Sequence, residues 1–291
     1  MLIPRFEYHK PSTLKEACEI KGKFKGKAQL LAGGTDIIPN MKKRIILPDS
    51  LISLNGISEL KSNSVSGKNR CARIGACATV SSLIRGKFLL PYSALLTGLE
   101  SLGSPLIRNM ATIGGNLATA RPAADLSPSL IAYKGKAILC SVAGKREVSL
   151  DDFFLGPGKT ILNDDEILAE IILDELPACT GSGYIKLGTR KALEISLVNV
   201  AAVIALEKPD GVIAGARIVM GAVGPIPLRA TTAENLLMGE KPSDGLFAEA
   251  GKAAAEDSRP IDDFRGSAEY RRDMVRVITV RALQKALHDI R

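Results

Sequence analysis

Two short glycine-rich segments contain the residues of this sequence best suited to hold an anion. They are residues 31–36 (Leu-Ala-Gly-Gly-Thr-Asp) and residues 111–117 (Ala-Thr-Ile-Gly-Gly-Asn-Leu). Glycine permits positive φ and has no Cβ, so successive backbone N–H groups can converge on one anion. Thr35 and Thr112 add hydroxyl donors beside those amides. Two such turns in one domain could hold the two phosphates of a dinucleotide from opposite sides.

Neither segment is a standard nucleotide fingerprint, because G-x-G-x-x-G is absent and no P-loop lysine follows either turn. A single Gly-Gly pair is more often only a tight turn, so the interpretation depends on there being two. The five cysteines show no C-x-x-C spacing, and we expect them to be reduced and mostly buried. With only two histidines, the sequence predicts neither a metal site nor catalytic residues of its own.

The composition is that of a folded protein with a basic surface. The 291 residues suffice for two domains, and the net charge is +8. Because aromatic residues are only 4% and Trp is absent, the charge points to a solvated face or an acidic partner, not to nucleic acid. Residues 21–27 and 271–281 are locally positive. No apolar run is long enough to span a membrane, and no signal peptide is apparent, so we expect a cytoplasmic protein.

The first half of the chain alternates between helix and strand signals. Thr13 and Glu16 have the spacing of a capping box, and Leu14, Ala17 and Cys18 fall on one helical face. An apolar run at 28–32 ends at the first glycine pair. Further on we expect short buried segments at 45–48 and 51–54, strands at 73–76, 137–142 and 167–173, and helices at 79–84 and 92–102.

A change to Pro, Gly, Ser and Thr at residues 176–183 predicts a boundary between a cofactor domain (1–176) and a smaller domain (177–291). In the second part, runs at 198–206 and 212–223 flank Lys208-Pro-Asp-Gly211, which predicts an antiparallel hairpin. A helix is expected at 246–255. In a last helix, the residues predicted to share one face are Tyr270, Met274, Val277, Ile278 and Ala282.

Five motifs together resemble a known family. They are A-G-G-T-D followed by Met41-Lys42, I-R-N-x-A-T-I-G-G-N at 107–116, A-D-L-x-P at 124–128, residues 153–159, and E-Y-R-R at 269–272. The pattern resembles the FAD-binding medium subunit of the xanthine dehydrogenase and carbon monoxide dehydrogenase group, over nearly the whole chain. This resemblance implies an α+β fold. Its first part would be an FAD-binding PCMH-type domain of two α/β subdomains, as in vanillyl-alcohol oxidase and MurB. An α+β C-terminal domain with an antiparallel sheet would follow.

The resemblance also implies which residues bind the cofactor. In chain order they are Ala32, Gly33, Gly34, Thr35, Asp36, Leu102, Thr112, Ile113, Gly114, Gly115, Asn116, Asp125, Leu168 and Lys186. Asp125 could accept a hydrogen bond from a cofactor hydroxyl; it could equally be a buried cap or lie in a solvated turn. The Lys186 ammonium could lie beside the N1–C2 edge of the flavin; alternatively it is a surface lysine beside a strand.

The implied cofactor is non-covalent FAD, with molybdenum and [2Fe–2S] clusters only in partner subunits. A large molybdenum subunit would oxidise the substrate, and a small iron–sulfur subunit would relay electrons to the flavin. NAD, oxygen or a quinone would accept them. The family's acidic Arg-Arg-Glu-Asp-Asp stretch is replaced here by residues 190–194 (Arg-Lys-Ala-Leu-Glu), which weakens the expectation of NAD. Two alternatives are a stand-alone MurB-like flavin reductase and an assembly paralogue without FAD.

Overall fold

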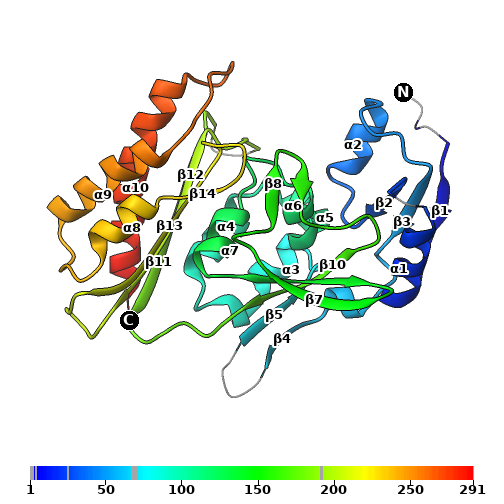
Figure 1. The fold of residues 1–291 in the computed structure, drawn as a ribbon, viewed down its shortest axis with the longest axis horizontal. Coiled ribbons are helices and arrows are strands. Elements are labelled where there is room, and N and C mark those ends of the chain that lie inside the picture. The colour runs from blue at the N-terminus through cyan, green and yellow to red at the C-terminus, as the bar shows by residue number, and fades with distance from the viewer. Residues whose placement is uncertain (1–2, 4, 25, 67–70, 191–192, 291) are drawn as a thin grey trace.

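The structure, a computed structural model, describes residues 3, 5–24, 26–66, 71–190 and 193–290. Over these residues the strands form a three-stranded, a five-stranded, a four-stranded and a two-stranded sheet. Figure 1 shows the N-terminal sheet at one end of the molecule and the four-stranded sheet with its helices at the other, with the five-stranded sheet between them. This arrangement confirms the predicted α+β fold class.

The N-terminal sheet is parallel, and helices make its crossovers. Its strands are β1 (Glu7–His9), β2 (Ala28–Leu31) and β3 (Ser50–Ser53) in the order β1-β3-β2, joined by α1 (Leu14–Lys23) and α2 (Ile37–Lys42). Thr13 caps α1 by accepting a hydrogen bond from the Glu16 amide at 3.2 Å. The Glu16 carboxylate accepts from the amide of Ser12, one residue earlier than a capping box requires. The first glycine turn directly follows β2, so the sheet fixes where it lies.

The central sheet is antiparallel, in the order β4-β5-β10-β6-β7. Its strands are β4 (Asn63–Ser66), β5 (Cys71–Gly75), β6 (Lys136–Ser141), β7 (Gly144–Ser149) and β10 (Ile167–Leu173). Short helices pack on it: η1 (Glu59–Lys61), α3 (Val80–Arg85), η2 (Lys87–Leu89), α4 (Ser93–Ser101), α5 (Pro105–Met110), α6 (Ile113–Ala118) and α7 (Ser127–Ala132). A small hairpin, β8 (Phe154–Gly156) with β9 (Lys159–Thr160), completes this part.

The C-terminal sheet consists of four consecutive antiparallel strands, β11 (Thr180–Leu187), β12 (Val198–Leu206), β13 (Ile213–Gly221) and β14 (Leu228–Arg229). Helices α8 (Thr231–Leu237), α9 (Asp244–Asp257) and α10 (Ala268–Asp289) cover one face (Figure 1). Alternate residues of β12 enter different cores: Ala201 joins the core beneath the short helices, whereas Val200 and Ala202 join the core beneath α10. Burial on both faces explains why the sequence of β12 is almost continuously apolar.

Most of the expected elements are confirmed, and two details were wrong. Ile45 and Leu47 are 66% and 62% exposed, because they lie in the loop between α2 and β3 instead of a buried segment. Residues 180–183, at the end of the stretch whose composition changes, lie within β11, where glycines allow α10 to approach closely. Tyr270 is exposed, and the buried face of α10 includes Arg271. Apolar periodicity could not reveal that face, because Arg271 is buried through its ion pair with Asp263.

All five cysteines are free, and Cys18, Cys77 and Cys140 are buried, as expected. Burial raises the pKa of the Cys18 and Cys77 thiols to about 11, so both remain protonated. Of the helices that the structure describes, none combines the length and apolar character needed to cross a membrane.

Candidate functional site

A cavity of about 580 Å³ lies between the N-terminal sheet and the central part of the molecule. Both glycine turns line it. The predicted cofactor contacts among its lining residues are Ala32, Gly33, Gly34, Thr35, Asp36, Leu102, Thr112, Gly114, Gly115, Asn116 and Leu168. Ile113 is fully buried in the central core, and Asp125 and Lys186 are not part of the lining. The structure therefore gathers most of the predicted residues, from distant parts of the chain, around one space.

The first turn leaves its backbone donors available. Gly34 has φ +75°, which L side chains rarely adopt. Within the described parts of the chain, no carbonyl or side chain accepts a hydrogen bond from the amides of residues 33–36. A Cβ on Gly33 would collide with the Met110 carbonyl, so this glycine is needed for contact with the segment just before the second turn. The two turns thus brace each other, and the free amides of the first are suited to an anion.

The second turn departs from the expectation, because its amides already have protein acceptors. Ile113 N donates to Ala78 O at 3.1 Å and Gly114 N to Ala76 O at 2.8 Å. The Gly115 amide donates to Thr112 Oγ1 at 3.1 Å, as the cap of α6. These bonds fasten the turn to the end of β5. Asn116 at the end of this turn is among the residues that line the cavity, and its Oδ1 atom is buried without a hydrogen-bond partner.

Two cations in the cavity wall were missed by the sequence analysis. Arg121 is exposed and follows Ala120, which has φ +47°. Lys21 lies in the last turn of α1, and its ammonium donates to the Asp164 carbonyl. Glu166 also lines the cavity, and hydrogen bonds from Arg146 lower its pKa. Only the proximity of Arg121 to the second glycine turn in the sequence could have suggested its place.

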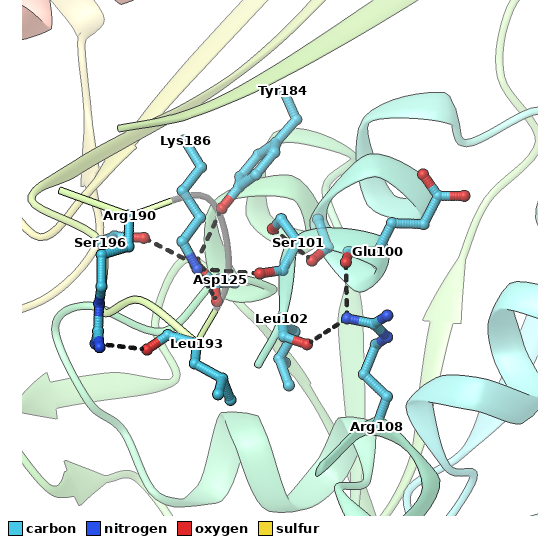
Figure 2. A network of polar contacts seen from close by, with 11 residues as sticks. Glu100, Ser101, Leu102, Arg108, Asp125, Tyr184, Lys186, Arg190, Leu193 and Ser196 are labelled. Carbon is cyan, nitrogen blue, oxygen red and sulfur yellow. Dashed lines mark hydrogen bonds and ion pairs between the residues drawn. The ribbon is translucent and has the colours of Figure 1, made fainter. Parts of the chain in front are cut away.

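Asp125 and Lys186 form a separate buried cluster, shown in Figure 2. Lys186 Nζ lies 2.8 Å from Asp125 Oδ2, and Asp125 Oδ1 accepts hydrogen bonds from Ser196 at 2.8 Å and Tyr184 at 3.3 Å. The Lys186 side chain is only 12% exposed, so it is not a surface lysine. Burial raises the pKa of Asp125, while Lys186 and the two hydroxyls oppose that rise. Burial also raises the pKa of Tyr184 well above 10, which keeps it a neutral donor.

The residues of the cavity fit FAD. A volume of about 580 Å³ is typical of a small-molecule site. Free amides and the cations Lys21 and Arg121 suit phosphates, and the orphaned Asn116 oxygen suits a hydroxyl or N–H donor. Leu102, Ile107 and Leu168 supply apolar wall for a flat ring system. By contrast, the described residues contain no group of three or more His, Cys, Asp or Glu side chains placed to hold a metal ion.

Comparison with known proteins agrees with this chemistry. Residues 4–176 match the family described as the FAD binding domain in molybdopterin dehydrogenase, and residues 183–286 match the CO dehydrogenase flavoprotein C-terminal domain. The carbon monoxide dehydrogenase medium chain of Hydrogenophaga pseudoflava is 33% identical over 287 residues, which are 98% of each chain. The glyceraldehyde dehydrogenase medium chain of Sulfolobus acidocaldarius is 32% identical over 292 residues, covering 98% of this chain and 99% of that one.

Solved structures agree as well. The carbon monoxide dehydrogenase from Hydrogenophaga pseudoflava that lacks the Mo-pyranopterin moiety superposes with a TM-score of 0.95 at 32% identity, covering 100% of both chains. Quinoline 2-oxidoreductase from Pseudomonas putida 86 gives a TM-score of 0.91 at 28% identity, covering 99% of both chains. Residues 4–176 are therefore an FAD-binding domain. The chain belongs to the FAD-binding medium subunits of the molybdenum hydroxylase family, the group of xanthine dehydrogenase and carbon monoxide dehydrogenase.

Proposed function

We propose that this chain binds FAD non-covalently in the cavity between its two glycine turns and transfers electrons within a molybdenum hydroxylase complex. A large molybdenum subunit would oxidise the substrate, and a small subunit would deliver electrons through [2Fe–2S] clusters. Bound FAD supplies the conversion between single-electron delivery and two-electron release to NAD or another acceptor. The names of the relatives support a multi-subunit enzyme, since several are medium chains or FAD subunits of dehydrogenases.

One observation carries the proposal. The free amides of residues 33–36 face the same cavity as the second glycine turn, and no other described group uses those amides. In this arrangement Gly33, Gly34, Thr35 and Asp36 would hold the pyrophosphate, with Ala32 shaping the turn. From the other wall, Thr112, Gly114, Gly115 and Asn116 would confine the cofactor, and Ile113 would anchor α6 in the core.

Leu102 and Leu168 would contact the ring system. The Asp125–Lys186 pair does not line the cavity and would act on the ring from behind Leu102, since Lys186 donates to the neighbouring Ser101 carbonyl. Lys186 would affect the flavin only together with Asp125, because the two charges are paired. Residues 190–194 replace the family's acidic stretch that bears on the use of NAD as acceptor. Within them, Arg190 forms an ion pair with Glu194 at 2.7 Å, and Lys191 and Ala192 lie outside the described residues. The intact turns favour this function over an assembly paralogue without FAD. A MurB-like reductase would need a proton donor at the flavin, and the sequence assigns no serine or carboxylate to that role.

The experiment is affinity purification of the tagged chain from its native cells, followed by identification of co-purifying subunits and measurement of flavin, iron and molybdenum. We expect one flavin-bearing chain together with a molybdenum subunit and an iron–sulfur subunit. Recovery of a flavin-containing chain alone, with reductase activity toward a nucleotide-sugar, would favour the MurB-like alternative. Recovery of partners without any flavin would favour the assembly paralogue.

A further inference from the structure

The last turn of α4 is held by two cations that come from different parts of the molecule. The guanidinium of Arg108, on α5, donates to the carbonyls of Glu100 and Leu102, each at 3.0 Å. The ammonium of Lys186, on β11, donates to the carbonyl between them, Ser101 O, at 3.1 Å (Figure 2). Three consecutive carbonyls at a helix C-terminus therefore each receive a charged donor. These carbonyls lack partners within the helix and carry its partial negative charge, so cations stabilise them.

The chain beyond this turn returns directly to the cavity. Leu102 is 8% exposed and lines the cavity, and Gly103 follows it with φ +53°. A Cβ on Gly103 would lie 2.9 Å from Ile107 Cγ2, so Ile107 packs tightly over the turn. Ser104 caps α5 by accepting from the Ile107 amide at 3.3 Å. Arg108 thus reaches back from α5 to fix the segment that presents Leu102, and Ile107 beside it also lines the cavity.

The two cations differ in what else they bind. Lys186 is paired with Asp125, which ties it to the buried cluster at the C-terminal sheet. No carboxylate forms a salt bridge with Arg108 in the portion of the chain that the structure describes, and the recorded bonds of its guanidinium are the two to carbonyls of 100 and 102. Its charge is thus directed at the backbone that carries Leu102. An arginine that only added charge to the surface would not need to donate hydrogen bonds to both the Glu100 and the Leu102 carbonyl.

We propose that Arg108 is a positioning residue for the cofactor: with Lys186 it clamps residues 100–102, and so fixes Leu102 and Ile107 against the flat ring system of bound FAD. The proposal rests on the proposed function of the cavity. Since the polar turns supply the groups that suit phosphates, the apolar side chains of Leu102 and Ile107 form wall suited to the ring. Arg108 itself is not among the cavity-lining residues, so it acts through them.

The test compares Arg108→Met, Arg108→Lys and a control, Arg272→Met, in the full chain. Arg272 is an exposed arginine on α10. FAD affinity is measured by quenching of flavin fluorescence, and ring orientation by the visible circular dichroism of the bound flavin. Arg108→Met should weaken FAD binding roughly three- to tenfold, the size of about one ordinary hydrogen bond, because Arg108 acts on the cofactor only through the segment that it holds. It should also change the dichroism band. Arg108→Lys should recover part of both effects, because an ammonium can bind one of the two carbonyls.

A double-mutant cycle with Leu102→Ala separates positioning from general destabilisation. If Arg108 acts through Leu102, then Arg108→Met should have little further effect on FAD affinity in the Leu102→Ala background. Additive losses, or unchanged affinity and dichroism in Arg108→Met, would overturn the proposal. Should Arg108→Met fail to fold, the lysine variant and its cycle with Leu102→Ala still decide. Failure of the wild-type chain to bind FAD would instead reject the proposed function, so the two failures are distinguishable.

Discussion

Lys186 and Asp125 form a buried ion pair at the junction between the C-terminal sheet and the helices of the central part, with Nζ 2.8 Å from Oδ2. Their side chains are 12% and 10% exposed. Because the two charges cancel at a distance, neither can be treated as an isolated charge near the cofactor. Replacing one member of the pair therefore leaves the charge of the other uncompensated. The two single variants should shift the midpoint potential of a nearby flavin in opposite directions.

The first prediction uses that opposition. Lys186→Met removes the cation that opposes the burial-raised pKa of Asp125. At a pH high enough to ionise Asp125, its uncompensated charge disfavours the negative charge that flavin reduction brings, so the midpoint potential should fall. Asp125→Asn leaves the ammonium unbalanced, so the potential should rise. The expected size is roughly 30 mV for each 1.4 kcal/mol of changed stabilisation. A spectroelectrochemical titration of the three proteins measures this. Equal potentials in all three would show that the pair lies too far from the flavin to affect it.

The second prediction separates the roles of two glycines. A side chain at Gly33 would collide with the Met110 carbonyl, whereas a Cβ at Gly115 would meet only Thr112 Oγ1, at 2.8 Å. Gly33→Val should therefore destabilise the FAD-free fold by about 1–3 kcal/mol through overpacking. Gly115→Val should destabilise the fold less, by disturbing the Thr112 cap of α6, but should reduce flavin content, because Gly115 lines the cavity. Urea unfolding and flavin absorbance measure the two effects; full flavin occupancy in Gly115→Val would contradict the assignment.

The third prediction concerns Asp263. Hydrogen bonds, first from Arg265 and also from Arg271, hold its pKa well below the ordinary 3.8. Since Arg271 is 1% exposed, Asp263→Ala would leave a buried cation without its carboxylate and should cost about 3–5 kcal/mol at neutral pH. A depressed pKa of an acid stabilises the fold above its unfolded value and loses that contribution as pH falls. The difference between wild type and variant should therefore shrink as pH falls below 3.8.

Unfolding free energies across the acid range test this prediction, with Asp273→Ala as the control. Asp273 is an exposed aspartate of the same helix as Arg271. Asp273→Ala should not lower the free energy of unfolding by a comparable amount at neutral pH. A difference between wild type and Asp263→Ala that stays constant into strong acid would mean that the ionised carboxylate is not what stabilises Arg271.

Local patterns in the sequence predicted elements well, and contacts between distant residues poorly. The strand expected at 167–173 has those bounds in the structure, because its apolar run is fixed by burial within the central sheet. Glycine at position 34 permits the positive φ seen there, although the sequence does not say which glycine of the pair adopts it. The contact of Gly33 with Met110 and the bonds of the second turn to Ala76 and Ala78 depend on tertiary packing, which no local pattern encodes.

The same contrast between local patterns and distant contacts applies to the candidate site. Motif spacing located the residues that line the cavity, yet not what their amides do once folded. The pairing of Lys186 with Asp125 joins residues 61 positions apart. Arg271 lies in a locally basic stretch of the sequence that suggests an exposed surface, yet its side chain is buried. In both cases a charged side chain is buried because an opposite charge accompanies it. A hydrophobic pattern carries no information about such pairs.

The last prediction concerns Asp289, which ends α10 beside the edge strand β11. Its Oδ2 accepts hydrogen bonds from Ser182 N at 3.0 Å and Ser93 Oγ at 2.6 Å, and so joins α10 to β11 and α4. A carboxylate at a helix C-terminus is electrostatically unfavourable, so these bonds must offset that cost. Asp289→Ala should lower the free energy of unfolding by about 1–3 kcal/mol, because the buried Ser182 amide loses its acceptor. Asp289→Asn, which keeps an acceptor oxygen, should cost less. Urea unfolding with an unchanged slope would measure the loss, and equal midpoints for wild type and Asp289→Ala would show that the contact adds nothing to stability.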